Sequence, residues 1–327
     1  MWWASSPQRA SSAAWLQPGC KGRTVPQARL ASVGVFDSGL GGLSVLEALR
    51  RELPHESFLY VADSRNAPYG NKPEDWIVAR CRELAHDFAR VPIKSWVWAC
   101  NTATGVAVHT LREVMPGLIG REAFPIVGLE PALKPAVLGT QTGVVGVLAT
   151  ARTLASDKYR RLRERAFSDW APLNPQARAL RVIDQVGAGF VETVEAGAVS
   201  GPQVQALVHA AVAPLLAAGA DTLVLGCTHY PFLADAIREV IATCAPRQPV
   251  ALINPAAAVA RELRRRLQAA DLLAPETGPA PAQCLTVYCS TAPVESSRQI
   301  FARLLGYGVD VHLWPDWLDR RQAPGRD

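Results

Sequence analysis

Two cysteines of this 327-residue chain stand in closely similar settings. Cys100 lies in VWACNTATG (97–105), and Cys227 lies in VLGCTHYP (224–231). Each cysteine follows a short apolar run, which predicts a buried strand, and precedes small hydroxyl or amide residues and a stretch with helical spacing. A helix N-terminus offers free N–H groups and partial positive charge, which favour a thiolate and lower its pKa. The pattern therefore predicts two reactive thiols at strand ends.

Two opposed and otherwise similar acid–base groups suit inversion at a carbon atom. One thiolate removes a proton from one face, and the other thiol delivers a proton to the opposite face. The α-proton of an amino acid is only weakly acidic, so such a site must stabilise a carbanion-like transition state with preorganised donors. Pyridoxal phosphate would bind as a Schiff base to lysine, and neither cysteine motif contains a lysine. We therefore expect no cofactor.

The opposing interpretation is that a buried cysteine is simply a small hydrophobic residue. The chain has seven cysteines, an odd number without a close CxxC pair, which fits neither a disulfide framework nor a structural zinc site. We expect no bound metal and a reduced, cytoplasmic protein. Two cysteines in equivalent places of two matching segments favour chemistry for that pair. The five others are expected to have no chemical role: Cys20, Cys81, Cys244, Cys284 and Cys289.

The elements that must position these thiols alternate between strand and helix. Strands are expected at 32–36, 57–63 and 95–100, with helices between them, which predicts a parallel sheet covered by helices on both faces. The pattern then repeats, because GVVGVLATARTL (143–154) resembles the first strand and its turn, and 221–240 repeats the plan around Cys100. We infer an internal duplication of α/β units. Since ligands bind beyond the carboxyl ends of parallel strands, the two thiols should face each other across one cleft.

The predicted fold class is α/β, with two pseudo-symmetric parallel-sheet domains and a C-terminal segment that returns to the first. Residues 1–31, rich in Ala, Ser, Pro and Gln, are expected to be disordered or foreign to the native protein, and CLTVYCST (284–291) to hold the final strand. The predicted domains are 32–127 plus 240–315 for the first and 128–239 for the second, followed by a tail at 316–327.

Composition and charge exclude several classes. Hydrophobic residues make up 49% of the chain and charged residues 19%, which suits a globular protein with a large core. No apolar stretch reaches the length of a membrane span. The net charge of +5 is spread out, and the runs RRLRER (160–165) and RELRRR (261–266) alternate with Glu and Leu at helical spacing. We interpret them as solvated helix faces rather than a nucleic-acid footprint.

Four motifs together resemble the glutamate racemases of the aspartate/glutamate racemase superfamily. They are GVFDSGLGGLSVL, YVADSRNAPYG, ACNTAT and LGCTHYP, within a resemblance that extends from about Ser32 to about Val259. The resemblance implies a cofactor-independent racemase that interconverts L- and D-glutamate and supplies D-glutamate for peptidoglycan, the bacterial cell wall and cell shape. It implies that Cys100 and Cys227 are the two bases, Cys100 acting on D-glutamate and Cys227 on L-glutamate. It leaves a homodimer open.

The same resemblance assigns supporting residues by motif. It implies that Asp37 assists Cys100, that His229 assists Cys227, and that Glu195 is the acidic residue of the second domain. The matches outside the cysteines are looser around Glu195 and at Pro255, which stands where the family more often has a small hydroxyl residue and glycine. The implied substrate-binding residues are Asp37, Ser38, Tyr69, Gly70, Asn101, Thr102, Thr228 and His229.

Simpler interpretations exist for each motif taken alone. Asp37 and Ser38 fit a helix N-cap, APYGNKP fits a turn, and GLGG lacks the lysine of a phosphate-binding P-loop. The nearest functional alternative is the same chemistry on aspartate or a hydantoin. A one-cysteine decarboxylase or isomerase, a two-domain amino-acid binding protein, and a redox or zinc protein are the others. The presence of both cysteines argues against the first. A binding protein predicts a clear secretion signal and needs no paired thiols, and a redox or zinc protein predicts closer cysteine spacing and metal-dependent folding.

Overall fold

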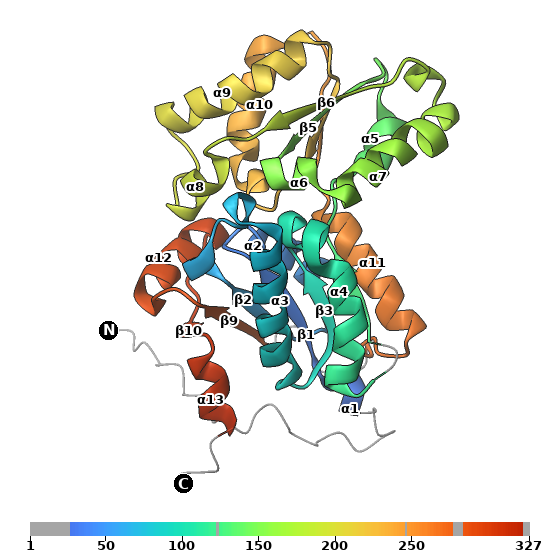
Figure 1. The fold of residues 1–327 in the computed structure, drawn as a ribbon. Helices are drawn as coiled ribbons and strands as arrows, with labels where there is room; N and C mark the ends of the chain where they lie inside the picture. The colour runs from blue at the N-terminus through green and yellow to red at the C-terminus, as the bar shows by residue number, and fades with distance from the viewer. Residues whose placement is uncertain (1–26, 122–123, 246, 277–283, 323–327) are drawn as a thin grey trace.

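The computed structural model describes residues 27–121, 124–245, 247–276 and 284–322, and it contains two parallel β-sheets. Figure 1 shows them one above the other, with the first sheet in the lower unit and the second in the upper. Both sheets are parallel throughout and carry helices on both faces, as predicted. The fold class is therefore confirmed.

The first sheet has the strand order β10-β9-β2-β1-β3-β4. Its central strand is β1, whose residues Val33 to Asp37 are fully buried because helices cover both faces. Helices α3 and α4 pack on one face and α2, α11 and α12 on the other. The strands are β1 (Ser32–Asp37), β2 (Phe58–Ala62), β3 (Ile93–Trp98), β4 (Ile126–Gly128), β9 (Thr286–Ser290) and β10 (Val311–Leu313). The helices are α2 (Leu43–Glu52), α3 (Glu74–Ala89), α4 (Asn101–Ile119), α11 (Ala256–Ala269), α12 (Val294–Leu305) and α13 (Asp316–Gln322).

The second sheet has the order β6-β5-β7-β8. Helices α8, α9 and α10 cover one face, and α5 and α7 cover the other. Its strands are β5 (Val144–Ala149), β6 (Arg181–Val186), β7 (Thr222–Leu225) and β8 (Ala251–Ile253). Its helices are α5 (Leu133–Gly139), α6 (Ala151–Ala155), α7 (Asp157–Arg165), α8 (Phe190–Glu195), α9 (Pro202–Ala217) and α10 (Ala234–Cys244).

The end of the second unit lies later than the sequence predicts. We expected residues from 240 onward to return to the first domain, but β8 pairs in parallel with β7, from Thr222 with Ala251 to Val224 with Ile253. α10 packs in the same core. The return begins with α11, whose Leu263 and Leu267 are buried beside α2 in the first unit. The strand VALIN therefore completes the second sheet instead of docking on the first.

Both ends of the described chain differ from expectation. Residues 27–30 form a short helix, α1 (Gln27–Leu30), and the carbonyl of Arg29 accepts a hydrogen bond from the buried Lys94 ammonium at 2.6 Å. This part of the predicted extension therefore docks on the first unit, while 1–26 lie outside the described residues. β9 is not the final strand, because β10 pairs beside it. In the predicted tail, α13 buries Trp317 and Leu318 in the first core, while 323–327 lie outside the described residues.

A dense aromatic cluster stabilises the first sheet beneath the strand ends. Phe36 of β1 packs edge-on against Trp98 at 5.1 Å between ring centroids, and Trp96 packs against Trp98 at 4.8 Å. Burying each large apolar side chain contributes about 1.5–3 kcal/mol. The strands that end in Asp37 and Cys100 are thus held rigidly side by side. Among the helices of the described residues, none is long and apolar enough to cross a membrane.

Candidate active site

The first thiol caps a long helix at the end of β3. Cys100 is the N-cap of α4, and its Sγ accepts a hydrogen bond from the Ala103 amide at 3.4 Å. The Ser38 hydroxyl lies 3.1 Å from the same sulfur atom. We predicted a lowered pKa at this helix start, but burial and the nearby Asp37 raise the pKa of the Cys100 thiol despite both hydrogen bonds. Cys100 is therefore held as a thiol.

Asp37 supplies a buried carboxyl group at the neighbouring strand end. Its Oδ2 accepts a hydrogen bond from the Gly42 amide at 2.8 Å, while Oδ1 has no partner among the described residues. Burial raises the pKa of Asp37 to about 6, against the opposing effects of the His229 charge and the Gly42 amide. A carboxyl group with this pKa exchanges protons near neutral pH.

The second thiol is part of a chain of acid–base groups. Cys227 follows β7 and lies 3.6 Å from Nδ1 of His229, whose Nε2 lies 2.6 Å from Oε1 of Glu195. Burial lowers the pKa of His229, but its contacts with Cys227 and Glu195 outweigh burial and raise the pKa well above its ordinary value. His229 is therefore suited to carry a proton beside the Cys227 sulfur. Glu195 is placed here by α8, where the sequence match was loosest.

The turn after β1 crosses from the first unit to the second. The Leu40 amide donates to Glu195 Oε1 at 2.6 Å, and the Gly41 amide lies 3.2 Å from His229 Nε2. A Cβ atom at position 39 would lie only 2.1 Å from Glu195 Oε1, so this close approach requires Gly39. The two halves of the site are thus in direct contact through the GLGG turn.

Asn101 is buried, at 4% exposure, and neither its amide nitrogen nor its amide oxygen has a partner among the described residues. A buried unpaired polar group costs about 1–3 kcal/mol, so both atoms are expected to have a ligand in the working protein. The neighbouring Thr102 hydroxyl lies 3.0 Å from that of Thr150 in the second unit. Thr228 is also buried, directly after Cys227.

Comparison with known proteins agrees with this geometry. The family model described as Asp/Glu/Hydantoin racemase matches residues 40–263. The glutamate racemase of Ectopseudomonas mendocina is 45% identical over 87% of this chain and 98% of that protein. That of Ralstonia nicotianae is 48% identical over 84% of this chain and 90% of that protein. The chain belongs to the glutamate racemase family.

Solved structures of the family share the fold. The glutamate racemase isoform RacE1 from Bacillus anthracis superposes with a TM-score of 0.69 at 29% identity, covering 86% of this chain and 97% of that one. The enzyme from Francisella tularensis, solved in complex with D-glutamate, also gives a TM-score of 0.69, at 25% identity, with the same coverage.

Within this family fold, the side-chain hydroxyl of Tyr69 is bonded inside the first unit. The Tyr69 hydroxyl does not extend toward the thiols but donates to Asp63 Oδ2 at 2.6 Å, and Asp63 also pairs with Arg80 at 2.9 Å. Tyr69 and Gly70 begin a short 3-10 turn, whose first amides have no partner within the turn. These two residues therefore offer backbone N–H groups rather than the phenol.

Sequence reasoning missed three residues around the thiols. Asp63 directly follows β2, where its amide donates to the Asp37 carbonyl, and its side chain holds the turn that carries Tyr69. Thr150 directly follows β5 as the N-cap of α6, and its hydroxyl lies 2.9 Å from that of Thr153 within α6; both hydroxyls approach Thr102. A signal was present for Asp63 and Thr150, because each is a polar residue at the carboxyl end of a predicted strand.

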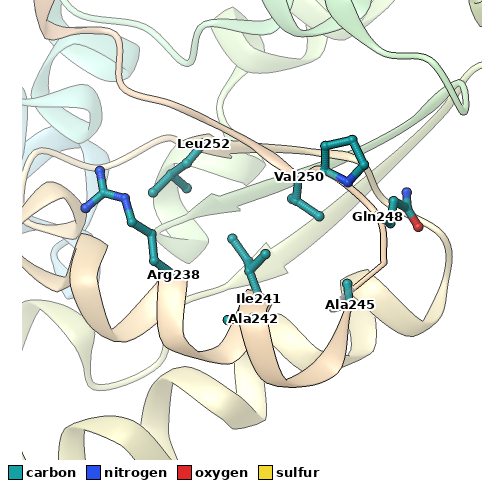
Figure 2. Close-up of a pocket in the computed structure, with 8 residues that line it drawn as sticks. Arg238, Ile241, Ala242, Ala245, Gln248, Val250 and Leu252 are labelled. Atoms are coloured by element: carbon teal, nitrogen blue, oxygen red, sulfur yellow. The ribbon is translucent and has the colours of Figure 1, made fainter.

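Two surface hollows in the second unit lie away from the thiols. Figure 2 shows the first, formed between α10 and the edge strand β8, with aliphatic side chains at its centre and Arg238 at one end. The other lies between α6, α7 and Asp184. Neither includes a residue of the cysteine site, which is closed: Cys100 is 5% exposed and Cys227 7%. The first hollow is lined by Arg238, Ile241, Ala242, Ala245, Gln248, Pro249, Val250 and Leu252.

Proposed function

We propose that the protein interconverts L- and D-glutamate by a two-base mechanism with Cys100 and Cys227 as the bases. The observation that carries the proposal is a pair of buried thiols, one at a strand end of each sheet, in two units that the GLGG turn and Ser44 join beside Cys227. The Cys100 sulfur contacts the Ser38 hydroxyl, and the Cys227 sulfur contacts the His229 imidazole. Membership of the glutamate racemase family supports this reaction, and the Francisella tularensis relative solved with D-glutamate supports the substrate.

In the L-to-D direction, Cys227 acts first. Its thiolate removes the α-proton of L-glutamate, and the electron pair of the C–H bond stays on the substrate as an enolate-like carbanion. His229, held by Glu195 and 3.6 Å from the sulfur, has a raised pKa and is suited to carry the proton that the thiol gives up. After the step, the new S–H proton can pass to His229 once the ring has released its own.

Cys100 completes the inversion from the opposite face. Its raised pKa keeps it protonated, so it is ready to donate its proton to the carbanion and form D-glutamate. The Ser38 hydroxyl, 3.1 Å from the sulfur, and the Ala103 amide then stabilise the resulting thiolate. Asp37, whose pKa is about 6, is suited to return a proton to this side. The D-to-L direction uses the same steps in reverse.

The unpaired polar groups supply the binding site. Asn101 offers one donor and one acceptor group, which suit the carboxylate and the ammonium of an amino acid. Backbone amides of Tyr69 and Gly70 and the hydroxyl of Thr228 provide further donors for the two carboxylates, while the Ser38 oxygen, whose proton is directed at Cys100, can accept from the ammonium. The hydroxyl of Thr102, next to Asn101, joins the first unit to Thr150 of the second. Binding glutamate would satisfy groups that are otherwise buried without partners, so the free energy of binding includes the removal of that penalty.

No step of this mechanism passes through a metal or an organic cofactor, since the thiols exchange the protons. In the cell, the product would be D-glutamate for peptidoglycan, made in the cytoplasm. A homodimer is part of the same proposal and is checked by light scattering of the purified protein. The alternatives, racemisation of aspartate or of a hydantoin by an enzyme of the same superfamily, use the same thiols with a different pocket shape.

The deciding experiment is a circular-dichroism or chiral-chromatography assay of purified protein with L-glutamate, L-aspartate and a hydantoin. Glutamate should have the highest kcat/KM, and a metal chelator should leave the rate unchanged. The spectrum should lack Schiff-base absorbance. Faster turnover of aspartate or a hydantoin would assign the alternative substrate, and activity lost on chelation and restored by metal would contradict the mechanism.

A further inference from the structure

The turn 39–44 is fixed from below by the first unit. The Tyr60 hydroxyl donates to the Gly39 carbonyl at 3.1 Å within the buried core, and Asp37 accepts from the Gly42 amide at 2.8 Å. Tyr60 is itself packed edge-on against Phe301 of α12. The turn is therefore a rigid platform and not an adaptable loop.

From this platform, two donors are directed at the second unit. The Leu40 amide donates to Glu195 Oε1 at 2.6 Å. The second donor is the Ser44 hydroxyl, which lies 2.9 Å from the carbonyl oxygen of Thr228, the residue between Cys227 and His229. Ser44 is thus the side chain that ties α2 of the first unit to the backbone of the Cys227 turn.

The Ser44 hydroxyl has one proton and two possible acceptors. Its oxygen also lies 2.9 Å from the carbonyl of Gly41 within its own turn, which is as close as the carbonyl of Thr228. When the two units separate, the proton is still accepted by Gly41, so breaking the contact with Thr228 leaves no unpaired hydroxyl. The contact between Ser44 and Thr228 therefore favours the arrangement in which the two units touch, and it does not prevent them from separating.

We propose that Ser44 is a positioning residue that sets the Cys227–His229 turn against the substrate held by the first unit. The inference rests on the two-base function proposed above. The proposed ligands of the first unit, Asn101 and Ser38, fix the substrate relative to Cys100 because all three directly follow or begin elements of the same unit. The distance from Cys227 to the α-carbon depends instead on how the second unit docks, and Ser44 acts on that docking.

The test compares Ser44→Ala with Ser95→Ala. Ser95 is a matched control, because its buried hydroxyl donates to the Pro125 carbonyl at 2.9 Å, far from the thiols and within the first unit. Both variants lose one serine hydroxyl bonded to a backbone carbonyl. We expect kcat/KM for glutamate to fall roughly tenfold in Ser44→Ala and to stay within about twofold of wild type in Ser95→Ala. Melting temperatures of both variants show whether each is folded.

Isotope effects distinguish positioning from general loosening. With α-deuterated L-glutamate, removal of the deuteron by Cys227 should become more rate-limiting in Ser44→Ala, so the isotope effect on kcat/KM should rise. With α-deuterated D-glutamate, the step at Cys100 becomes less limiting, so the isotope effect should fall. An activity equal to that of Ser95→Ala, or a slower variant with both isotope effects unchanged, would overturn the proposal. Wild-type protein inactive on glutamate would instead refute the proposed function on which it rests.

Discussion

Cys100 and Cys227 occupy equivalent strand ends in their two sheets, yet their surroundings differ. The sulfur of Cys100 contacts a serine hydroxyl and a helix amide, and its pKa is raised. The sulfur of Cys227 contacts an imidazole that is supported by a carboxylate. A duplicated framework therefore carries two chemically unequal halves. Symmetry of the backbone thus places the two thiols, whereas the local partners give each thiol its own acid–base surroundings.

The consequence is that each thiol has its own proton carrier. Cys100 is held as a thiol close to Asp37, whereas Cys227 lies beside His229, whose raised pKa favours the protonated ring. In the two-base mechanism proposed above, each turnover leaves a proton on one side that must return to the other. Asp37 and His229 are the groups suited to these transfers, because each lies beside one thiol and each has a raised pKa.

The largest expected effect is the loss of either thiol. Cys100→Ala and Cys227→Ala should each reduce racemisation by about 10³-fold or more, since one of two required proton positions is removed. In heavy water, the remaining thiol should still exchange the α-proton on its own face. Cys100→Ala should label L-glutamate and Cys227→Ala should label D-glutamate, as followed by proton NMR of the α-position.

The control for the thiol variants is Cys244→Ala, because Cys244 is exposed on α10 and away from the site. It should retain full activity. Labelling of the opposite enantiomers would reverse the face assignment while keeping the two-base mechanism. Undiminished racemisation by either active-site variant would contradict the mechanism.

The sequence predicted those features of the two thiol surroundings that follow from local patterns. Periodicity and strand-end polar residues predicted the two sheets and the placement of Cys100, Cys227 and Asp37 at their edges. The short strand β8 was assigned to the wrong sheet, because a three-residue strand carries no information about its partner. The lowered pKa expected for Cys100 was wrong, since burial is a tertiary effect that the local helix start does not reveal.

Side-chain direction was the other limit. Tyr69 was predicted to bind substrate, and the motif gave no sign that its hydroxyl is taken by Asp63. Glu195 lay in a poorly matching segment. Its place beside His229 arises only when α8 packs against the GLGG turn of the first unit. Such contacts join residues far apart in the chain, so spacing along the sequence does not encode them.

The second prediction concerns the pH dependence of stability on the Cys100 side. Because the folded pKa of Asp37, about 6, exceeds its ordinary 3.8, the folded protein binds more protons between these values. Its stability should therefore fall as pH rises from about 4 to about 6, and the difference corresponds to about 3 kcal/mol at most. Asp37→Asn removes this penalty and should unfold at higher urea concentration than wild type at pH 7.5, but not at pH 3.5, while losing activity.

Asp235→Asn is the matched control for Asp37→Asn, because Asp235 is exposed on α10 and pairs only at the surface, with Arg238. Its unfolding midpoint should follow wild type at both pH values. If Asp37→Asn is no more stable than wild type at pH 7.5, ionising Asp37 does not destabilise the folded protein. The pKa of Asp37 would then not be raised by burial, and the two thiol surroundings would differ less than described.

The third prediction concerns the partner of Cys227. His229→Asn keeps a polar side chain but removes the imidazole base, so the racemisation rate should fall about 10²-fold. The control is His209→Asn, which should keep wild-type activity because His209 is paired with the exposed Cys244. The isotope effect with α-deuterated L-glutamate should rise in His229→Asn, because the proton transfer at Cys227 then lacks its neighbouring imidazole. An unchanged isotope effect would mean that His229 only packs beside the thiol.

The smallest expected effect is on the contact between the two halves. In Gly39→Ala the new methyl group would lie 2.1 Å from Glu195 Oε1, and since that carboxylate ends a flexible side chain, it should move away instead of unfolding the protein. His229 then loses its acceptor, so kcat/KM should fall roughly tenfold with little change in melting temperature.

Gly117→Ala is the control, because a Cβ atom there meets no atom within 4 Å, and it should keep full activity and gain about 0.5–1 kcal/mol of stability. Since the displaced carboxylate belongs to the Cys227 half, deuterium exchange into L-glutamate should slow more in Gly39→Ala than exchange into D-glutamate. Equal slowing of both would show that the turn supports the whole site, and the two halves would be less independent than their contacts indicate.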